Sequence, residues 1–273
     1  MSGFETADLG VFDGPLAAFG GPYNNHLALR AVLTDARRRG AERILCLGDL
    51  GGFGPNPGKI YPLLAEFDAV TISGNYDRSL AERLADCGCG YTHPADNHFA
   101  QLSYDYTNRR TTDAERAWLR ALPAEARMIR GGRRWLFCHG SPRRVNEFLW
   151  ESGCSDAFLE RLAADAGADQ VLCTHTGLHW QRLLPSGARF VNVGAVGRPA
   201  NDGDPAVRYA FFGSGAAGAA EAEFVRVPYD HEALGREMEQ EGLPAEFVET
   251  IRTGWWTTCL EILPAKERAR GRF

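Results

Sequence analysis

Residues 43–58 read RILCLGDLGGFGPNPG. The first five residues of this stretch predict a short apolar strand, which breaks at Gly48-Asp49 into a loop rich in glycine and proline. Residues 70–77, VTISGNYD, repeat the pattern with a break at Gly74-Asn75. Apolar strands of this kind are typical of the buried, largely parallel sheet of an α/β protein. The two stretches therefore predict an α/β fold with polar residues at the strand ends.

The same alternation extends to both sides of these strands. Residues 16–19 predict another strand, and residues 29–33 carry apolar residues at helical spacing after Asn24 and Asn25, either of which can cap that helix. The other predicted elements are a mostly helical region at 80–122, a hairpin at 127–138, helices at 156–166 and within 230–254, and strands at 170–173, 181–184, 189–193, 207–212 and 223–227. Strands dominate the later half, which predicts a second, more antiparallel sheet.

Length and composition limit the class of protein. The 273 residues, 44% hydrophobic and 24% charged, suffice for one large domain. The 30 basic and 35 acidic residues give a net charge of −5, which excludes a disordered protein and argues against general nucleic-acid binding. Apolar runs are far shorter than the roughly 20 residues of a membrane span, and residues 1–10 do not resemble a signal peptide. We therefore expect a cytoplasmic protein with reduced thiols, since its seven cysteines are an odd number and mostly isolated.

Four polar clusters follow predicted strands at glycine turns. They are Gly48-Asp49, residues 74–77 (GNYD), residues 138–142 (CHGSP) and residues 174–177 (THTG). Because ligands bind at the carboxyl ends of strands in α/β sheets, we expect the four clusters to converge on one site. Their Asp, Asn and two His side chains form a mixed oxygen and nitrogen ligand set, which suits Mn, Fe, Zn or Ni.

These clusters resemble, in order and spacing, the motifs of the metallophosphoesterase (calcineurin-like phosphoesterase) family. That family has Asp-x-His, then Gly-Asp, Gly-Asn-His-Asp, a lone His and Gly-His-x-His. The resemblance covers about residues 16–228, including residues 192–197 (NVGAVG), which are similar to a late glycine-rich stretch of the family. It implies a four-layer α/β/β/α sandwich of two mixed sheets. We expect residues 1–273 to form a single domain, with a C-terminal helical extension and tail at about 229–273.

The departures from the family concern one metal site. In the family, three residues bind only the first of the two metals. At these positions this sequence has Gly21, Tyr23 and Gly177. The resemblance therefore implies that the first site keeps only the shared Asp49. The second site is complete, and its implied ligands are Asp49, Asn75, His139 and His175. We expect one divalent transition metal.

Three further residues are candidates for catalysis from the same resemblance. Tyr76 replaces the family's general-acid His, and Asp77 is retained beside it. Asn25 matches a family position near the phosphate and lies at a predicted helix N-terminus, which favours anions. The implied function is a metal-dependent hydrolase that uses one metal to activate water against a small-molecule phosphoester or another anionic substrate. A phenol is poorly matched to acid catalysis at neutral pH, and one metal gives weaker charge compensation than two.

Two alternatives remain beside the hydrolase. One is a non-catalytic binding or scaffold protein that keeps the fold, and the other is a mononuclear iron protein with different chemistry. Tyr23 and Tyr76 either act at the site or fill the space of an absent metal, and Trp255-Trp256 forms either a partner surface or a docked tail. Further histidines are interpreted as surface or capping residues in preference to replacement ligands: His26, His93, His98 and His179. Residues 87–110 and 143–154 are expected to cover the site, and they do not identify the substrate.

Overall fold

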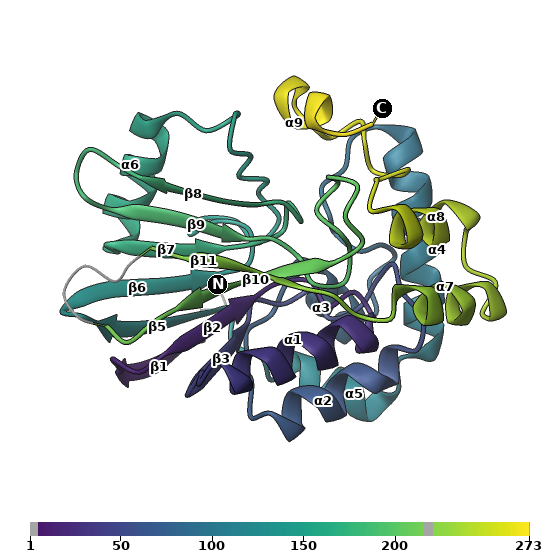
Figure 1. The fold of residues 1–273 in the computed structure, drawn as a ribbon, viewed down its shortest axis with the longest axis horizontal. Helices are drawn as coiled ribbons and strands as arrows, with labels where there is room; N and C mark the ends of the chain where they lie inside the picture. The colour runs from purple at the N-terminus through teal and green to yellow at the C-terminus, as the bar shows by residue number, and fades with distance from the viewer. Residues whose placement is uncertain (1–4, 216–220, 273) are drawn as a thin grey trace.

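The computed structural model describes residues 5–215 and 221–272 and contains two mixed β-sheets (Figure 1). The six-stranded sheet has the order β1 (Thr6–Val11), β5 (Glu125–Arg130), β6 (Arg133–Cys138), β7 (Gln170–Cys173), β9 (Arg189–Val193), β8 (His179–Leu183). The five-stranded sheet has the order β11 (Glu223–Val227), β10 (Val207–Phe212), β2 (Leu16–Phe19), β3 (Arg43–Cys46), β4 (Val70–Thr71). Strands β6, β7 and β9 are parallel, as are β2, β3 and β4.

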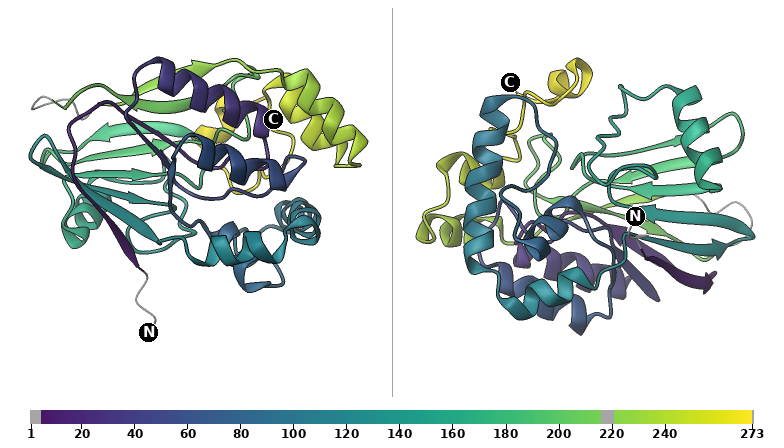
Figure 2. Two further views of the ribbon diagram at one scale, coloured as in Figure 1. Left: turned by 90° about the horizontal axis from the view of Figure 1, so that it is seen from below. Right: turned by 180° about the vertical axis from the view of Figure 1, so that it is seen from behind.

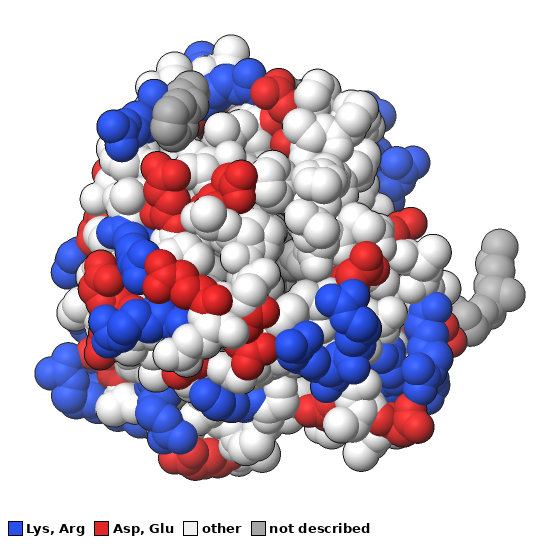
Figure 3. All heavy atoms as spheres, turned by 90° about the vertical axis from the view of Figure 1, so that its right-hand side faces the viewer, with Lys and Arg blue, Asp and Glu red and all other residues white. Residues whose placement is uncertain are grey.

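The helices connect and flank these sheets. They are α1 (His26–Arg38), η1 (Pro57–Lys59), α2 (Ile60–Glu66), α3 (Asn75–Glu82), α4 (Pro94–Arg110), α5 (Asp113–Arg120), α6 (Asp156–Ala166), α7 (His231–Gln240), α8 (Ala245–Thr253) and α9 (Ala265–Arg270). No helix in the described ranges has both the length and the apolar character needed to cross a membrane. In the face shown in Figure 3, acidic and basic side chains are interspersed around a largely uncharged area.

Alternation along the buried strands produces four layers. Leu16 and Ala18 of β2 face the other sheet, where they join a core with Phe137 of β6. Ala17 and Phe19 of the same strand face the opposite way and pack with α1 and α2. On the far side of the six-stranded sheet, α6 covers β6, β7 and β9. Because successive strand residues point to opposite faces, one apolar run serves two cores, and the expected α/β/β/α sandwich is confirmed.

Three features differ from the sequence predictions. Strand β1 was not predicted, because it is a half-exposed edge strand without a continuous apolar run. Strands β10 and β11 do not build a separate antiparallel sheet but extend the sheet of β2, β3 and β4. Residues 83–93, placed in a helical region, lie outside α3 and α4. The pairing of β10 with β2 joins residues almost 200 positions apart, which a local pattern does not reveal.

The C-terminal helices pack against the first half of the chain. Helices α7 and α8 share an apolar cluster with Phe53 of the loop after β3 and Tyr106 of α4. Figure 2 shows α4 running alongside the C-terminal segment when the molecule is seen from behind. Trp256 is only 3% exposed, and its Nε1 donates a hydrogen bond to the carbonyl of Pro199 at 2.7 Å. The tail is therefore docked on the core at this residue.

Candidate metal centre

The predicted polar clusters lie where strands of both sheets end. Asp49 and Asn75 follow β3 and β4 of one sheet, whereas His139 and His175 follow β6 and β7 of the other. The structure thus brings the clusters to the neighbouring carboxyl edges of two sheets instead of to one sheet edge. Asp49 and His175 have positive φ values of 58° and 67°, which turns the chain sharply at each strand end.

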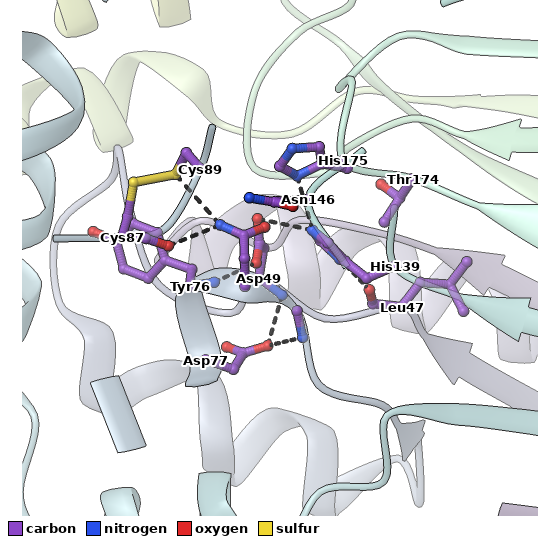
Figure 4. A network of polar contacts seen from close by, with 12 residues as sticks. Leu47, Asp49, Tyr76, Asp77, Cys87, Cys89, His139, Asn146, Thr174 and His175 are labelled. Atoms are coloured by element: carbon purple, nitrogen blue, oxygen red, sulfur yellow. Dashed lines mark hydrogen bonds and ion pairs between the residues drawn. A yellow bond between two sulfur atoms is a disulfide. The ribbon is translucent and has the colours of Figure 1, made fainter. Parts of the chain in front are cut away.

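Three of these side chains converge. His139 Nε2 lies 3.1 Å from Asp49 Oδ2 and 3.2 Å from His175 Nδ1. One ligand atom from each of the three residues lies within 4.8 Å of the others, and all three residues are buried. Figure 4 shows the two imidazoles and the carboxylate pointing toward one another. This arrangement could hold a metal ion.

Backbone contacts fix the orientation of the cluster. His139 Nδ1 lies 2.6 Å from the carbonyl oxygen of Leu47, so that its N–H is directed there and Nε2 is left for the cluster. Asp77 accepts hydrogen bonds from the N–H groups of Asp49 at 2.7 Å and Leu50 at 3.0 Å. Tyr76 N–H donates to Asp49 Oδ1 at 3.0 Å. Asp77 thus holds the turn that carries Asp49.

The side-chain amide of Asn75 is only partly hydrogen-bonded within the described residues. Its Nδ2 donates to the carbonyl of Cys87 at 2.9 Å and contacts Cys89 Sγ at 3.4 Å, which fixes the orientation of the amide. Its Oδ1 is buried and has no hydrogen-bond partner among the described residues. A buried carbonyl oxygen without a donor is costly, and a cation would satisfy it. The donor set of two imidazoles, a carboxylate and an amide oxygen therefore fits a divalent transition metal.

Burial and mutual charge set the protonation of the cluster. Burial, followed by the neighbouring His139, lowers the pKa of His175 to about 3, so His175 is neutral at pH 7. Burial opposes charge on His139, but Asp49, the Leu47 carbonyl and Asp77 together raise the pKa of His139. Burial likewise opposes charge on Asp49, but His139, His175 and the Tyr76 N–H together lower the pKa of that carboxyl. A metal would displace the His139 proton, since only the neutral imidazole is a ligand.

The positions that the resemblance assigns to a first metal are filled by other side chains. A Cβ at Gly21 would lie 2.5 Å from Tyr23 Cζ, because the ring of Tyr23 lies over this glycine. A Cβ at Gly177 would lie 3.3 Å from Trp256 Cη2 and Cζ2. The indole of Trp256 is in turn covered by the guanidinium of Arg198, at 3.7 Å from its ring centroid. Packed aromatic rings and one cation thus occupy this half.

A cavity of about 80 Å³ adjoins both halves. Its lining includes Asp49 and His175 from the cluster and Arg198 from the segment after β9. Aromatic rings from the first half of the chain and from the C-terminal helices form much of the wall: Tyr23, Phe53, Tyr76, Tyr91, Phe99 and Phe247. Residues 87–110 therefore contribute to the cavity, as expected. From the second covering segment, Phe148 lies 4.2 Å from the His175 ring, measured between centroids.

Asn25 and Tyr76, two of the candidate catalytic residues, make hydrogen bonds to other parts of the protein. Asn25 caps α1, where its Oδ1 accepts from Ala28 N–H at 2.9 Å. Its Nδ2 donates to Gly197 O and Tyr229 Oη, so the amide has no hydrogen atom left for a phosphate. The hydroxyl of Tyr76 lies 3.4 Å from Ser103 Oγ and also contacts α4 at a threonine, although its ring lines the cavity. Burial raises the pKa of Tyr76.

Two of the other histidines lie outside the cluster. His26 faces Glu237 and Lys59, and His179 packs against Phe224; neither joins the cluster. Sequence reasoning missed Arg198, although it directly follows the segment that resembles the family's late glycine-rich motif. Nothing in the sequence linked it to Trp256, because the two residues are far apart in the chain.

The expectation of reduced thiols is wrong for one pair. Cys87 and Cys89 form a disulfide with Cα atoms 5.3 Å apart, and the positive φ of Gly88 between them, 61°, turns the chain back on itself. The other cysteines are free thiols in the structure: Cys46, Cys138, Cys154, Cys173 and Cys259. Cys46, Cys138 and Cys173 are buried in the apolar cores.

Comparison with known families and proteins agrees with this geometry. Residues 24–212 match the calcineurin-like phosphoesterase superfamily domain. The chain is 25% identical over 243 residues to the uncharacterized protein MJ0912 of Methanocaldococcus jannaschii, a match that covers 85% of this chain and 95% of that protein.

Solved structures show the same fold. A metallophosphoesterase from Sphaerobacter thermophilus is 26% identical with a TM-score of 0.67, and the match covers 89% of this chain and all of the other. The hypothetical protein PH1004 from Pyrococcus horikoshii is 21% identical with a TM-score of 0.71, covering 89% of this chain and 99% of the other. The second likeness concerns the fold alone.

Proposed function

This chain belongs to the calcineurin-like phosphoesterase superfamily, and from that membership we propose that it is a phosphoester hydrolase with one metal. The proposed ligands are Asp49, Asn75, His139 and His175. The observation that carries the proposal is the Oδ1 of Asn75, which is buried and has no hydrogen-bond partner among the described residues. The next residue in the chain, Tyr76, donates its N–H to Asp49 Oδ1. A buried oxygen without a hydrogen-bond donor destabilises the fold when the site is empty, whereas it can coordinate a metal ion when the site is occupied.

The residues around the proposed metal have different roles. When bound, a divalent metal would lower the pKa of a water molecule and polarise a phosphoryl oxygen. Leu47 holds the His139 ring by its carbonyl, and Asp77 holds the turn of Asp49. Tyr76 keeps its proton, because burial raises its pKa, and its hydroxyl contacts Ser103 and Thr107 of α4, so its part is to line the cavity with its ring instead of transferring a proton. Asn25 serves as a helix cap.

The cavity indicates a small reacting group. Its volume of about 80 Å³ suits a single phosphoryl group beside the metal, whereas a larger ester would extend outward. Residues of α8 and the segment that follows it contribute to the wall, including Phe247 and Cys259. We therefore propose that residues 229–273 belong to the same functional unit as the core.

Metal content and hydrolysis together test the proposal. The chain is purified without chelator, its metals are quantified by plasma mass spectrometry, and hydrolysis of p-nitrophenyl phosphate and bis(p-nitrophenyl) phosphate is measured with the metal found. We expect about one equivalent and metal-dependent hydrolysis. His175→Ala should lose both, whereas His179→Ala, a change at a half-buried histidine outside the cluster, should keep both. A chain that stays metal-free after metal is offered contradicts the proposal.

A non-catalytic binding protein is the second candidate. The packing of Tyr23 and Trp256 over Gly21 and Gly177 favours it, because the second cation that the family uses for charge compensation has no room there. This candidate predicts one equivalent of metal and phosphate binding, with no turnover of either ester. The same assay therefore separates the two functions.

A further inference from the structure

Arg198 is a buried cation that has no acidic partner among residues 5–215 and 221–272. It is 7% exposed, and its guanidinium lies between the rings of Trp256, at 3.7 Å, and Phe53, at 5.2 Å. Its Nη2 donates to the carbonyl of Thr258 at 2.7 Å. Its Nε is buried and makes no hydrogen bond within the described part of the chain, where Arg198 also forms no ion pair with a carboxylate. Such a charge is costly unless an anion pairs with it.

The position of Arg198 indicates where that anion lies. Arg198 lines the same cavity as Asp49 and His175, and Tyr23 and Tyr91 line it as well. The neighbouring Gly197 N–H donates to Gly21 O at 2.7 Å, which ties the segment of Arg198 to the loop that resembles the first metal-binding motif. The guanidinium is thus held beside the half of the centre that has lost its ligands. Two aromatic faces and one carbonyl fix its plane.

We propose that Arg198 binds the phosphoryl group of the substrate, with Tyr23 and Tyr91 as neutral hydrogen-bond donors, and so supplies the positive charge of the missing second cation. This inference rests on the proposed function and names the group that the cavity accepts. A guanidinium suits the role, because its planar fork can donate two parallel hydrogen bonds to phosphate oxygens. The cavity of about 80 Å³ has room for one such tetrahedral anion.

The test measures binding of inorganic phosphate to the full chain by calorimetry, with metal content determined on each sample. We expect Arg198→Gln to weaken phosphate binding about 10-fold or more, as for loss of a hydrogen-bonded charge. Metal content should stay at the wild-type value. Arg208→Gln is the control, because Arg208 is paired with Asp202 and Asp204 outside the cavity. Unchanged phosphate affinity in Arg198→Gln overturns the inference.

A second variant guards against a folding defect. Arg198→Lys keeps the charge and much of the side-chain volume but loses the planar fork, so we expect a folded protein with phosphate affinity between those of wild type and Arg198→Gln. Circular dichroism checks the fold of both variants. Phosphate affinity equal to wild type in Arg198→Lys and Arg198→Gln contradicts the inference.

The outcome also separates this inference from the proposed function. If the chain holds one metal and Arg198→Gln binds phosphate normally, the metal centre stands and the role of Arg198 fails. If the chain holds no metal but Arg198→Gln still weakens phosphate binding, the hydrolase proposal fails and the anion site stands. Kinetics adds a third readout, since loss of a phosphoryl contact should raise KM and lower kcat.

Discussion

The half of the centre that keeps its ligands and the half that has lost them are built on the same loops but filled differently. Asp49, His139 and His175 face one another, and Asn75 leaves a buried oxygen free. In the other half, rings lie over the two glycines. One half thus contains a carboxylate and two imidazoles that converge, whereas the other contains packed rings and a cation of its own.

The backbone is not what separates the two halves. Gly21 N–H donates to Gly48 O at 3.0 Å, directly beside Asp49, and Tyr23 N–H donates to Asp49 O at 3.4 Å. Gly197 N–H binds the same loop. The loops of a two-metal site are therefore in contact here, and the difference lies in the side chains they carry. The loss of ligand side chains at Gly21 and Gly177 is one change, and the packing of Tyr23 and Trp256 over these glycines is another. This structure shows both changes.

The largest effect is expected on metal content, when a proposed ligand in the retained half is replaced. His175→Ala removes a neutral buried imidazole from the cluster and should reduce bound metal from about one equivalent to less than a tenth. Tyr23→Phe, which changes only a hydroxyl in the filled half, should leave the metal bound. Plasma mass spectrometry on both variants measures the difference. Equal metal content in His175→Ala and Tyr23→Phe would contradict the claim that only the retained half binds metal.

The filled half is tested by removing its packing. Trp256 is buried, covers Gly177 and stacks on Arg198. Trp256→Ala should therefore lower the free energy of unfolding by about 3 to 5 kcal/mol, as for other large aromatic truncations. Urea denaturation measures this change. Trp118→Ala is the control, because Trp118 is 39% exposed and should cost less. A loss below 1 kcal/mol for Trp256→Ala would show that this half is not tightly packed.

Rebuilding the lost ligands should reveal whether packing keeps the second metal out. The triple variant Gly21→Asp, Tyr23→His, Gly177→His restores the ligand types that the resemblance implies. A side chain at Gly177 meets Trp256 and also adopts a φ of +75°, which is strained for a non-glycine residue. We expect the triple variant to bind no second equivalent, and Trp256→Ala added to it to allow partial binding. Two equivalents in the triple variant alone would contradict the packing argument.

The smallest effect concerns His179, a half-buried histidine outside both halves. Burial, followed by Arg208, lowers the pKa of His179 to about 4. Above its unfolded pKa near 6.5 both states are neutral; as pH falls below that value the unfolded chain takes up a proton first, so folding stability is lost. In the metal-free protein, His179→Phe should lessen the fall in unfolding free energy between pH 7 and pH 5 by about 1 to 2 kcal/mol. Urea titrations at the two pH values measure it, and an unchanged slope would contradict the shift.

Strand ends were predictable and long-range packing was not. The clusters at Asp49, His139 and His175 follow apolar strands, so local pattern sufficed to place each of them at the carboxyl end of a strand. That these ends belong to two neighbouring sheets depends on the tertiary fold. Arg198 and Trp256 make their contact across nearly 60 residues, and no local rule joins an arginine to one indole among several. Asn25 was predictable as a helix cap, but its bonds to Gly197 and Tyr229 depend on the tertiary fold.

Part of the wall around the cavity comes from residues that follow the cluster in the chain. His175 is the last of the proposed ligands, whereas Phe247, Thr258 and Cys259 line the cavity from the C-terminal segment. During translation, the four proposed ligands therefore leave the ribosome before this C-terminal part of the wall. A metal ion has its widest access to the nascent chain in that interval. Synthesis in metal-poor medium followed by loading of the finished protein should consequently be slower than loading during synthesis.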